Sequence, residues 1–322
     1  MIVHFILHGE TLESIAEDIK LENPLYLKEY HNRRCAREDF IVDRLIPGKR
    51  LLIPADSDIA QYNLRNDAPF KSPDRNPEIP FQPQQLNRKY SVGIVEKTYF
   101  EQEISQQAVF YDALLQWMGL EEGNHLFHYS KLSFYNRKDG ILGDLAEDCI
   151  KSLNPIEIKT DLQGKITGVR MSPEVAGRFK EIKDRLLDLY PGPYAKTYIE
   201  EFAYAVQNPE LFNERMKDDI FIKTYFASIR TPFRNGISRY PFPLSDPGIS
   251  LAIIQTAEPP VQPSEILLSQ KTEPDAAFPG ALYSGQYIIR KEDGLIAGIR
   301  IDYEYTEYGS RNTTQVIVDE KP

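Results

Sequence analysis

The chain opens with IVHFILHGETL at residues 2–12, and the sequence IPGKRLLIP follows at residues 46–54. The first stretch is apolar and rich in β-branched residues up to Leu7, which predicts a short strand that ends at a turn beginning with Gly9. The second predicts a turn at Pro47 and Gly48, followed by a strand that Pro54 ends. What lies between these two strands therefore decides the fold of the N-terminal part of the chain.

Two helices are predicted between the strands. Thr11 can cap the first helix by accepting a backbone hydrogen bond. The apolar residues of this helix recur at helical spacing, namely Leu12, Ile15, Ala16 and Ile19. Asn23 and Pro24 predict the start of the second helix, whose apolar side comes from Leu25, Leu27 and Tyr30. The predicted order is strand, helix, helix, strand.

Four motifs in residues 1–55 point to a known family. They are Gly9-Glu10-Thr11-Leu12 at the first turn, Ile15-Ala16 on the first helix, Leu27 with Asn32 on the second, and Pro47-Gly48-Lys49-Arg50-Leu51-Leu52-Ile53-Pro54 at the end. Together they resemble the LysM family of small βααβ modules. The stretch from Asn32 to Gly48 is several residues longer than in the common form of that family. The resemblance predicts a compact binding module at the start of an otherwise unassigned chain.

The resemblance also implies a ligand and a site. LysM modules bind the N-acetylglucosamine-containing chains of peptidoglycan or chitin in a shallow groove between the turn after the first strand and the loop before the last. Carried over to this chain, the resemblance implies a binding groove formed by Gly9, Glu10, Thr11, Leu12, Asn32, Ile46, Pro47 and Gly48. On this interpretation the protein is a non-catalytic peptidoglycan-binding protein that carries a larger interaction domain.

The long loop supports a second interpretation. It carries Arg33, Arg34 and Arg37, followed by an apolar run over residues 40–42. These arginines are either a solvated loop or a contact for an anion or a protein, because a guanidinium offers a bidentate fork. LysM-like modules also occur in baseplate and tail proteins of contractile injection machines, where they dock other subunits. The alternative is therefore a cytoplasmic protein–protein adaptor or assembly component of a type VI secretion or phage-tail-like machine.

Composition narrows the classes of partner. The chain of 322 residues has a net charge of -10 at pH 7 and a pI near 5.2, so it has no overall attraction for nucleic acid or anionic lipid. The N-terminus lacks the pattern of a signal peptide. No segment approaches the roughly 18 apolar residues of a membrane span. We expect a cytoplasmic protein, or one exported without an N-terminal signal peptide, that does not insert into membranes.

The remainder of the chain is predicted to have α+β structure. Residues 56–88 have the composition of a proline-rich linker. Residues 89–230 are predicted to form a mixed α+β domain with a helical block at 172–227, and residues 231–280 a second proline-rich segment with one isolated strand. Residues 281–322 are predicted to form antiparallel strands that pack on the main body. The predicted fold is therefore a βααβ module tethered to a larger body of antiparallel hairpins and helices.

Local patterns predict several elements of the larger body. Residues 90–100 and 125–135 fit strands, while residues 108–118 fit either a strand or a short helix. A hairpin is predicted at 154–171, and Ser172 with Pro173 is predicted to begin the helical block. The pattern Gly-x-Ile-x-Gly-[Val/Ile]-Arg occurs at 164–170 and again at 294–300. It indicates either two ordinary hairpins with the same turn chemistry or a duplicated half-motif.

No motif in the chain predicts catalysis, because the nucleophile-elbow, Walker, zinc-protease and dinucleotide patterns are all missing from it. His125 and His128 have a spacing worth weighing for a metal site, but a strand would place them on opposite faces. Cys35 and Cys149 are predicted to be reduced thiols, and His31 makes only a weak case for Cys35 as a nucleophile. We expect no enzyme activity, no cofactor and no metal; a cell-wall hydrolase is a third and weaker alternative.

The chain contains 19 tyrosines, and many of them occur at spacings typical of a core. Those on the last predicted hairpin, Tyr303, Tyr305 and Tyr308, are the best candidates for exposed contacts, because a tyrosine ring combines an apolar body with a polar tip.

Overall fold

The computed structural model describes residues 2–101, 103–135, 141–244, 250–259, 262–273, 280–307 and 309–322. These residues form eight α-helices and a large antiparallel sheet, so the predicted mixture of α and β structure is confirmed. The chain divides into two compact units. Unit 1 comprises Met1–Asn76 with Arg234–Gly236, and unit 2 comprises Pro77–Phe233 with Ile237–Pro322. Within the described ranges, no helix has the length and apolar character needed to cross a membrane.

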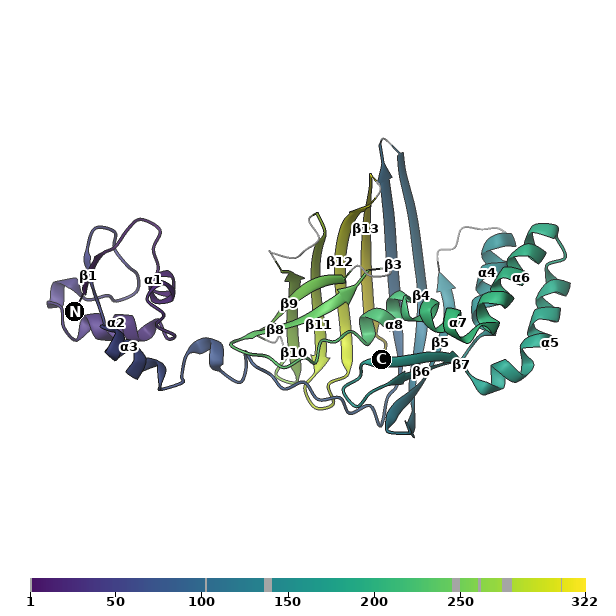
Figure 1. The fold of residues 1–322 in the computed structure, drawn as a ribbon, viewed down its shortest axis with the longest axis horizontal. Helices are drawn as coiled ribbons and strands as arrows, with labels where there is room; N and C mark the ends of the chain where they lie inside the picture. The colour runs from purple at the N-terminus through teal and green to yellow at the C-terminus, as the bar shows by residue number, and fades with distance from the viewer. Residues whose placement is uncertain are drawn as a thin grey trace. The chain divides into compact units, whose positions relative to one another are not determined.

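Unit 1 contains two short strands and three helices (Figure 1). In chain order its elements are β1 (Ile2–Phe5), α1 (Leu12–Asp18), α2 (Leu25–Asn32), the 3-10 helix η1 (Arg37–Asp39), β2 (Arg50–Ile53), α3 (Asp56–Asn63) and the 3-10 helix η2 (Pro69–Lys71). The strands pair in antiparallel fashion, with Ile2 opposite Ile53 and Phe5 opposite Arg50. Leu27 and Leu51 are fully buried at the centre of its core.

The start of α1 follows from its sequence. The Ser14 backbone N–H donates to the Thr11 hydroxyl at 3.1 Å, and the Thr11 N–H donates to the Ser14 hydroxyl at 3.0 Å. This reciprocal pair satisfies backbone donors that a helix start leaves without partners. Ile15 and Ala16 are buried one turn later, so the predicted cap and apolar face of this helix are confirmed.

The predicted linker at 56–88 is wrong, and its first part belongs to unit 1. Residues 56–63 form α3, in which Ile59 is 8% exposed. The Tyr62 ring stacks on Tyr26 with centroids 4.7 Å apart. The Asn63 side chain accepts a hydrogen bond from the Glu22 backbone at 2.9 Å. The apolar residues at positions 59 and 62 have helical spacing, and burying them against the core outweighs the polar character of the segment.

The rest of the predicted linker belongs to unit 2. Leu86 is 2% exposed, and its carbonyl accepts a hydrogen bond from the Trp117 backbone at 2.8 Å. The Gln82 backbone donates to the carbonyl of Asp293 at 2.9 Å, and Phe81 packs against the core of unit 2. Prolines interrupt a regular hydrogen-bond ladder, but they do not prevent an extended segment from packing on a folded body.

Unit 2 is built on an antiparallel sheet of eleven strands among the described residues, in the order β7-β6-β5-β4-β3-β13-β12-β11-β10-β9-β8. The strands are β3 (Asn87–Phe100), β4 (Glu103–Glu121), β5 (Asn124–Tyr135), β6 (Ile156–Thr160), β7 (Ile166–Met171), β8 (Ile237–Pro243), β9 (Ser250–Glu258), β10 (Glu265–Thr272), β11 (Leu282–Arg290), β12 (Ile296–Glu307) and β13 (Ser310–Glu320). The ambiguous residues 108–118 are therefore strand, within β4.

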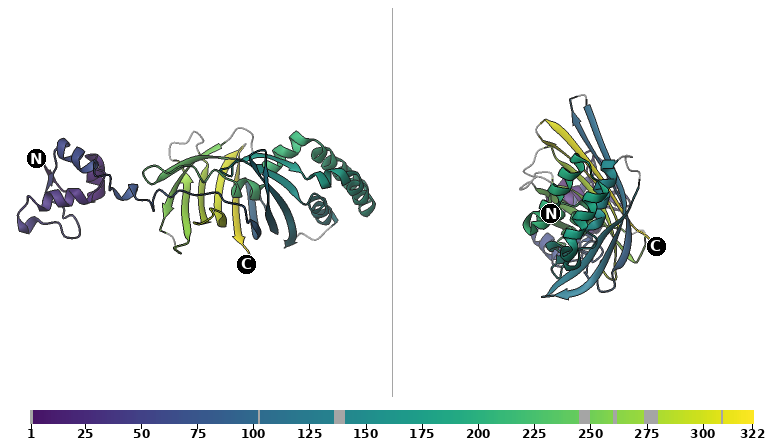
Figure 2. Two further views of the ribbon diagram at one scale, coloured as in Figure 1. Left: turned by 90° about the horizontal axis from the view of Figure 1, so that it is seen from below. Right: turned by 90° about the vertical axis from the view of Figure 1, so that its right-hand side faces the viewer.

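The helices of unit 2 fall into two groups (Figures 1 and 2). Four of them gather near β5, β6 and β7: α4 (Ile141–Ser152), α5 (Pro173–Leu189), α6 (Pro193–Gln207) and α7 (Pro209–Lys217). The fifth, α8 (Ile220–Tyr225), lies on one face of the sheet and contacts β12. Ser172 caps α5 as predicted, because its hydroxyl accepts a hydrogen bond from the Val175 backbone at 3.4 Å.

The predicted irregular segment at 231–280 is also wrong, because it contains β8, β9 and β10. Two of its prolines, Pro241 and Pro243, lie in β8, which pairs with β9 alone in the described sheet. An edge strand tolerates proline because one side of it donates no ladder hydrogen bonds. Pro259 and Pro263 lie between β9 and β10. Proline density therefore marked an edge strand and strand connections here.

The three C-terminal strands were predicted as strands, and this is confirmed, but they lie in the middle of the sheet. β13 pairs with β3, with Val318 opposite Val92. The three C-terminal strands β11, β12 and β13 therefore join the two halves of the sheet and do not form a separate layer on the main body. Because this pairing connects positions more than two hundred residues apart, no local pattern predicts it.

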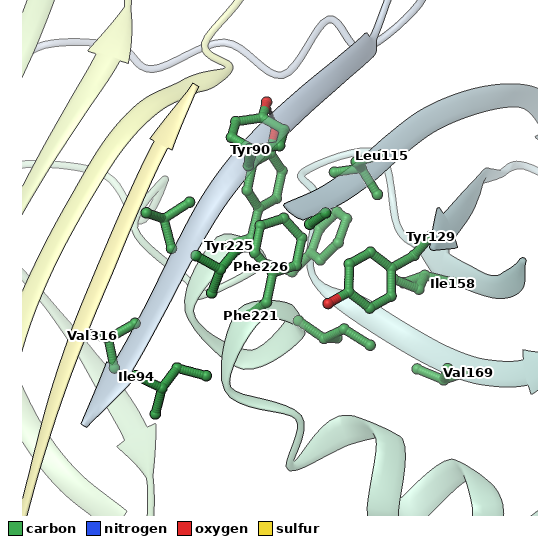
Figure 3. Close-up of a cluster of buried hydrophobic side chains, with 14 of the residues drawn as sticks. Tyr90, Ile94, Leu115, Tyr129, Ile158, Val169, Phe221, Tyr225, Phe226 and Val316 are labelled. Atoms are coloured by element: carbon green, nitrogen blue, oxygen red, sulfur yellow. Dashed lines mark hydrogen bonds between the residues drawn. The ribbon is translucent and has the colours of Figure 1, made fainter. Parts of the chain in front are cut away.

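The inner face of the sheet is packed with aromatic residues around α8 (Figure 3). Tyr90 from β3 and Tyr225 from α8 are fully buried, and their hydroxyl oxygens lie 3.0 Å apart. The Phe221 ring stacks on Tyr129 of β5 with centroids 5.0 Å apart. Burial raises the pKa of Tyr225 to about 12. Burying each such ring contributes about 1.5–3 kcal/mol, so α8 is held firmly against the sheet.

The two copies of the glycine-rich pattern lie in hairpins, β6–β7 and β11–β12. Gly164 and Gly294 both have positive φ, at 84° and 70°. A Cβ on Gly294 would overlap the carbonyl of Pro80, and one on Gly164 would lie 3.1 Å from the ring of Phe81. The two turns thus lie against Pro80 and Phe81, which are neighbours in sequence. This close approach, together with the positive φ, explains why both turns contain glycine.

Candidate functional site

The two predicted walls of the N-terminal groove lie at the same end of the β1–β2 ribbon. Beyond the last strand pair, the Ile6 N–H donates to the Lys49 carbonyl at 3.0 Å, and the Gly48 N–H donates to the Ile6 carbonyl at 2.8 Å. These bonds continue the antiparallel pairing. They bring residues 7–12 beside residues 45–49, and we call these two segments together the loop end of unit 1.

Glu10 shapes the first wall of the loop end. Its carboxylate accepts a hydrogen bond from the Leu7 backbone at 2.7 Å and lies 2.8 Å from His4 Nε2. The bond from Leu7, followed by the bond from His4, lowers the pKa of Glu10. A carboxylate held in this way closes the turn after β1. Glu10 therefore acts first as a structural residue of the loop.

The remaining predicted residues of the loop end divide by exposure. Thr11 uses its hydroxyl to cap α1, and Leu12 is half-buried against the core of unit 1. Five predicted residues are exposed to solvent, namely Gly9, Thr11, Ile46, Pro47 and Gly48. Leu7, which was not predicted, is 62% exposed, and Ile46 is 52% exposed. The surface offered to a ligand is therefore mostly backbone and aliphatic side chain.

Asn32 has a different role from the predicted one. Its side-chain amide donates to the Ile41 carbonyl at 2.9 Å, and its oxygen accepts from the Ile41 N–H at 2.9 Å. Both functions of the amide are thus used to hold the loop after α2. Ile41 is buried by this anchor, at 7% exposed. Asn32 is a positioning residue for the loop and not a wall of the groove.

His31, which was not predicted as a site residue, completes this anchor. Its ring is 1% exposed, Nδ1 accepts a hydrogen bond from the Leu52 N–H at 3.0 Å, and Nε2 donates to the Asp39 carbonyl at 2.9 Å. These bonds tie η1 and β2 to the end of α2. The available signal was the position of a histidine at the end of a helix and directly before an asparagine.

The three arginines of the loop do not converge on one point. Arg33 pairs with Glu29 at 2.6 Å across one helical turn. The Arg34 guanidinium lies 3.8 Å from the centroid of the Tyr30 ring, and Arg37 is exposed in η1. Arg33 and Arg34 therefore each have an interaction partner within unit 1. An exposed pair of this kind contributes at most about 1 kcal/mol, so a partner can displace it.

The cysteines and histidines of the chain are dispersed. Burial raises the pKa of the half-buried Cys35 thiol, and it raises the pKa of Cys149 to about 11. His125 lies on β5 and accepts a hydrogen bond from the Trp117 indole at 3.1 Å, while His128 lies 3.5 Å from Glu157. No group of three or more potential metal ligands occurs among the residues that the structure describes.

The predicted exposed tyrosines of the last hairpin are corrected in part. Tyr303 is 6% exposed, because it lies on the same inner face of the sheet as Ile301, while Asp302 between them faces outward. Tyr305 is half-buried, and Tyr308 lies outside the described residues. The prediction for Tyr303 was wrong because the same alternation fits either face of a strand, and only the sheet decides which face is covered.

Comparisons with known proteins assign no family. No family model matches the chain, and no curated protein matches it. A similar solved structure is titled "Lipid-protein interactions in lipovitellin"; it has a TM-score of 0.43 and 8% sequence identity, and the match covers 75% of this chain. The chain spans about a quarter of the lipovitellin chain, since 25% of that chain is covered. This similarity is too low to carry an argument about fold or function.

Proposed function

We propose that unit 1 is a LysM-type module and that the protein is a non-catalytic binding protein. Its loop end, residues 7–12 with 45–49, is proposed to recognise an N-acetylglucosamine-containing glycan such as peptidoglycan. The observation that carries the proposal is the pair of hydrogen bonds from Ile6 to Lys49 and from Gly48 to Ile6, which places the two loops side by side. The strand, helix, helix, strand order of residues 2–53 supports it.

The chemistry of the loop end suits a sugar chain. A glycan offers hydroxyl and acetamido groups to backbone N–H and C=O groups, and apolar C–H faces to aliphatic side chains. Leu7 and Ile46 supply exposed aliphatic surface, and Gly9 has no side chain to cover the backbone. Because Glu10 and Thr11 already have internal partners, recognition is expected to rest on backbone groups and on these two aliphatic side chains.

The experiment is sedimentation of the full chain with purified peptidoglycan. We expect retention that N-acetylglucosamine oligomers compete away, and binding at least about fivefold weaker in Ile46→Ser, since losing one well-placed apolar contact removes about 1 kcal/mol. Leu64→Ser is the matched control, because Leu64 is 82% exposed and belongs to the same unit. Equal retention of the two variants, or retention that free oligomers leave unchanged, would contradict the proposal.

A second candidate is docking onto a protein subunit, including a subunit of a contractile injection machine. The specific observation is that Phe40 and Val42 are 45% and 70% exposed on the arginine-bearing loop. Exposed aromatic and aliphatic side chains beside arginines are typical of protein interfaces. On this candidate, Phe40→Ser with Val42→Ser abolishes co-purification with a co-expressed baseplate or tail subunit. Peptidoglycan retention, if present, would then stay unchanged.

A further inference from the structure

Unit 2 contains a cavity of about 640 Å³ that is lined by Lys223 of α8 and by residues of the segment that follows this helix. Its wall includes residues from β7 and β8, which are the two edge strands of the sheet. The side chains that matter are four cations, Lys165, Lys217, Lys223 and Arg239, and two aromatic rings, Phe226 and Phe242. We call this space the lysine cavity. It is separate from the loop end of unit 1, and its interpretation does not depend on the glycan proposal.

The charges of the lysine cavity are unbalanced. No carboxylate belongs to the part of its wall that the structure describes. Arg239 has a partner outside the wall, since its Nε lies 2.9 Å from Glu273. The carboxylates of Asp218 and Glu96 act on Lys223 through space. The cavity therefore has a positive wall in a chain whose net charge is -10.

Lys223 is the most unusual group in the wall. It is 6% exposed, and its Nζ has no hydrogen-bond partner among the described residues. The Nζ atom lies over the face of the Phe242 ring, 5.4 Å from its centroid. Burial lowers the pKa of Lys223, and Asp218 and Glu96 oppose this effect only in part. A buried ammonium without a hydrogen-bonded partner is strongly unfavourable.

A half-buried lysine in the same unit, Lys131, has the carboxylate partner that Lys223 lacks among the described residues. Lys131 on β5 places its Nζ 2.6 Å from the Asp219 carboxylate. Although burial opposes it, the charge of Asp219 raises the pKa of Lys131. Lys223 follows Asp219 by four residues in sequence, yet its ammonium has no hydrogen-bond partner in the part of the chain that the structure describes. The missing partner is therefore specific to the lysine cavity.

We propose that the lysine cavity binds a small organic anion, a carboxylate or sulfonate attached to an apolar body. The anionic group pairs with the Lys223 ammonium, which has no hydrogen-bond partner among the described residues. The apolar body packs on Phe226 and Phe242, while Lys217 and Lys165 attract the anion to the wall. The volume is in the range of small-molecule sites, about 300–1,000 Å³.

The composition of the wall favours an organic anion over inorganic phosphate. Phosphate sites usually present several converging N–H donors, often from arginine or a helix start. Here a single buried ammonium lies over the face of the Phe242 ring, and Arg239 is already paired with Glu273. One charge beside an apolar surface matches a ligand with one charge and an apolar body. The ligand class follows from this pairing of one buried cation with two rings.

The test is a fluorescence titration of the full chain with 8-anilinonaphthalene-1-sulfonate, an aromatic monosulfonate, under conditions where the protein is folded. We expect saturable binding at one site, competed by octanoate and far less by inorganic phosphate. Lys223→Met should weaken binding at least about tenfold, because a charge-assisted bond contributes about 1.5–3 kcal/mol. Lys180→Met is the matched control, since Lys180 is an exposed lysine on α5.

A second variant keeps the test decisive if Lys223→Met does not fold. Lys217→Ala removes a half-buried cation from the same wall, and we expect about threefold weaker binding from lost electrostatic attraction. The proposal is overturned if the probe shows no saturable binding, or if both variants bind as tightly as the control. Competition by phosphate equal to that by octanoate would also overturn it, because the apolar body would then have no role.

Discussion

The loop end of unit 1 and the lysine cavity of unit 2 differ in whether their polar side chains have hydrogen-bond partners within the described protein. In unit 1, Glu10 and Thr11 have partners within the protein, and Asn32 holds the adjoining loop. In unit 2, the Lys223 ammonium has no hydrogen-bond partner in the described structure. Polar groups that have partners within the protein fix the conformation of the loops. A buried group without such a partner lowers stability and is explained most directly by a ligand that supplies its partner.

Removing the half-buried Lys131, whose ammonium has a carboxylate partner, should have the largest effect. Lys131→Met leaves the Asp219 carboxylate, 6% exposed, without its cation, and Asp219 also caps α8 through the Ile222 backbone. Because the carboxylate left without its cation is buried, the change should destabilise unit 2 by about 3 kcal/mol. Urea unfolding of the full chain, followed by tryptophan fluorescence, measures the loss. A change no larger than that of Lys180→Met would show that the Lys131–Asp219 pair is not structural.

The anchor of the unit 1 loop should give the next largest effect. His31→Ala removes the acceptor of the Leu52 N–H and the donor to the Asp39 carbonyl, and it opens a cavity beside β2. We expect a loss of about 2 kcal/mol in unit 1. Hydrogen exchange measures it as reduced protection of the Leu52 amide. His8→Ala is the control, because His8 is exposed, and unchanged protection in His31→Ala would contradict the anchor.

The unpaired lysine should show a smaller effect of the opposite sign. Lys223→Met removes a buried ammonium and keeps its aliphatic chain, so we expect unit 2 to gain about 1 kcal/mol at pH 7. Since the pKa of Lys223 is lowered in the folded protein, the unfolded chain binds more protons there, and wild-type stability rises with pH toward the ordinary lysine pKa of about 10.4.

The gain in Lys223→Met should therefore shrink as the pH approaches that value. Urea unfolding at pH 7, 9 and 10.5 measures the difference between the variant and the wild type. A variant that is less stable than the wild type at pH 7 would mean that the ammonium has a stabilising partner after all. In that case the contrast between the loop end and the lysine cavity would disappear.

Local features of the sequence predicted local features of the structure. Thr11 and Ser172 cap helices where their neighbours predicted it, and the strand and helix order of residues 2–53 follows the apolar spacing. The loop-end residues Gly9 and Gly48 were predicted from turn chemistry, and both have positive φ. These outcomes depend on hydrogen bonds and periodicities that span a few residues, so a short stretch of sequence contains the necessary information.

Proline density led to wrong predictions because proline, too, is a local feature of the sequence. The segments 56–88 and 231–280 contain many prolines, and they still form α3, β8, β9 and β10 or pack on a core. Proline reports only that a backbone donor is missing at one position. Whether that position needed a donor depends on which strand lies beside it, and Pro241 lies on an edge.

The amino-acid sequence by itself determined the helix caps, the turns and the alternation of each strand, because those follow from short-range contacts. The tertiary structure alone decided that β13 lies beside β3, that Tyr303 faces inward and that the Lys223 ammonium is buried without a hydrogen-bond partner among the described residues. Each of these depends on residues distant in the chain that fold together, and burial is a property of the assembled sheet. From sequence alone a lysine is expected to be exposed to solvent, and only the folded structure shows that Lys223 is buried.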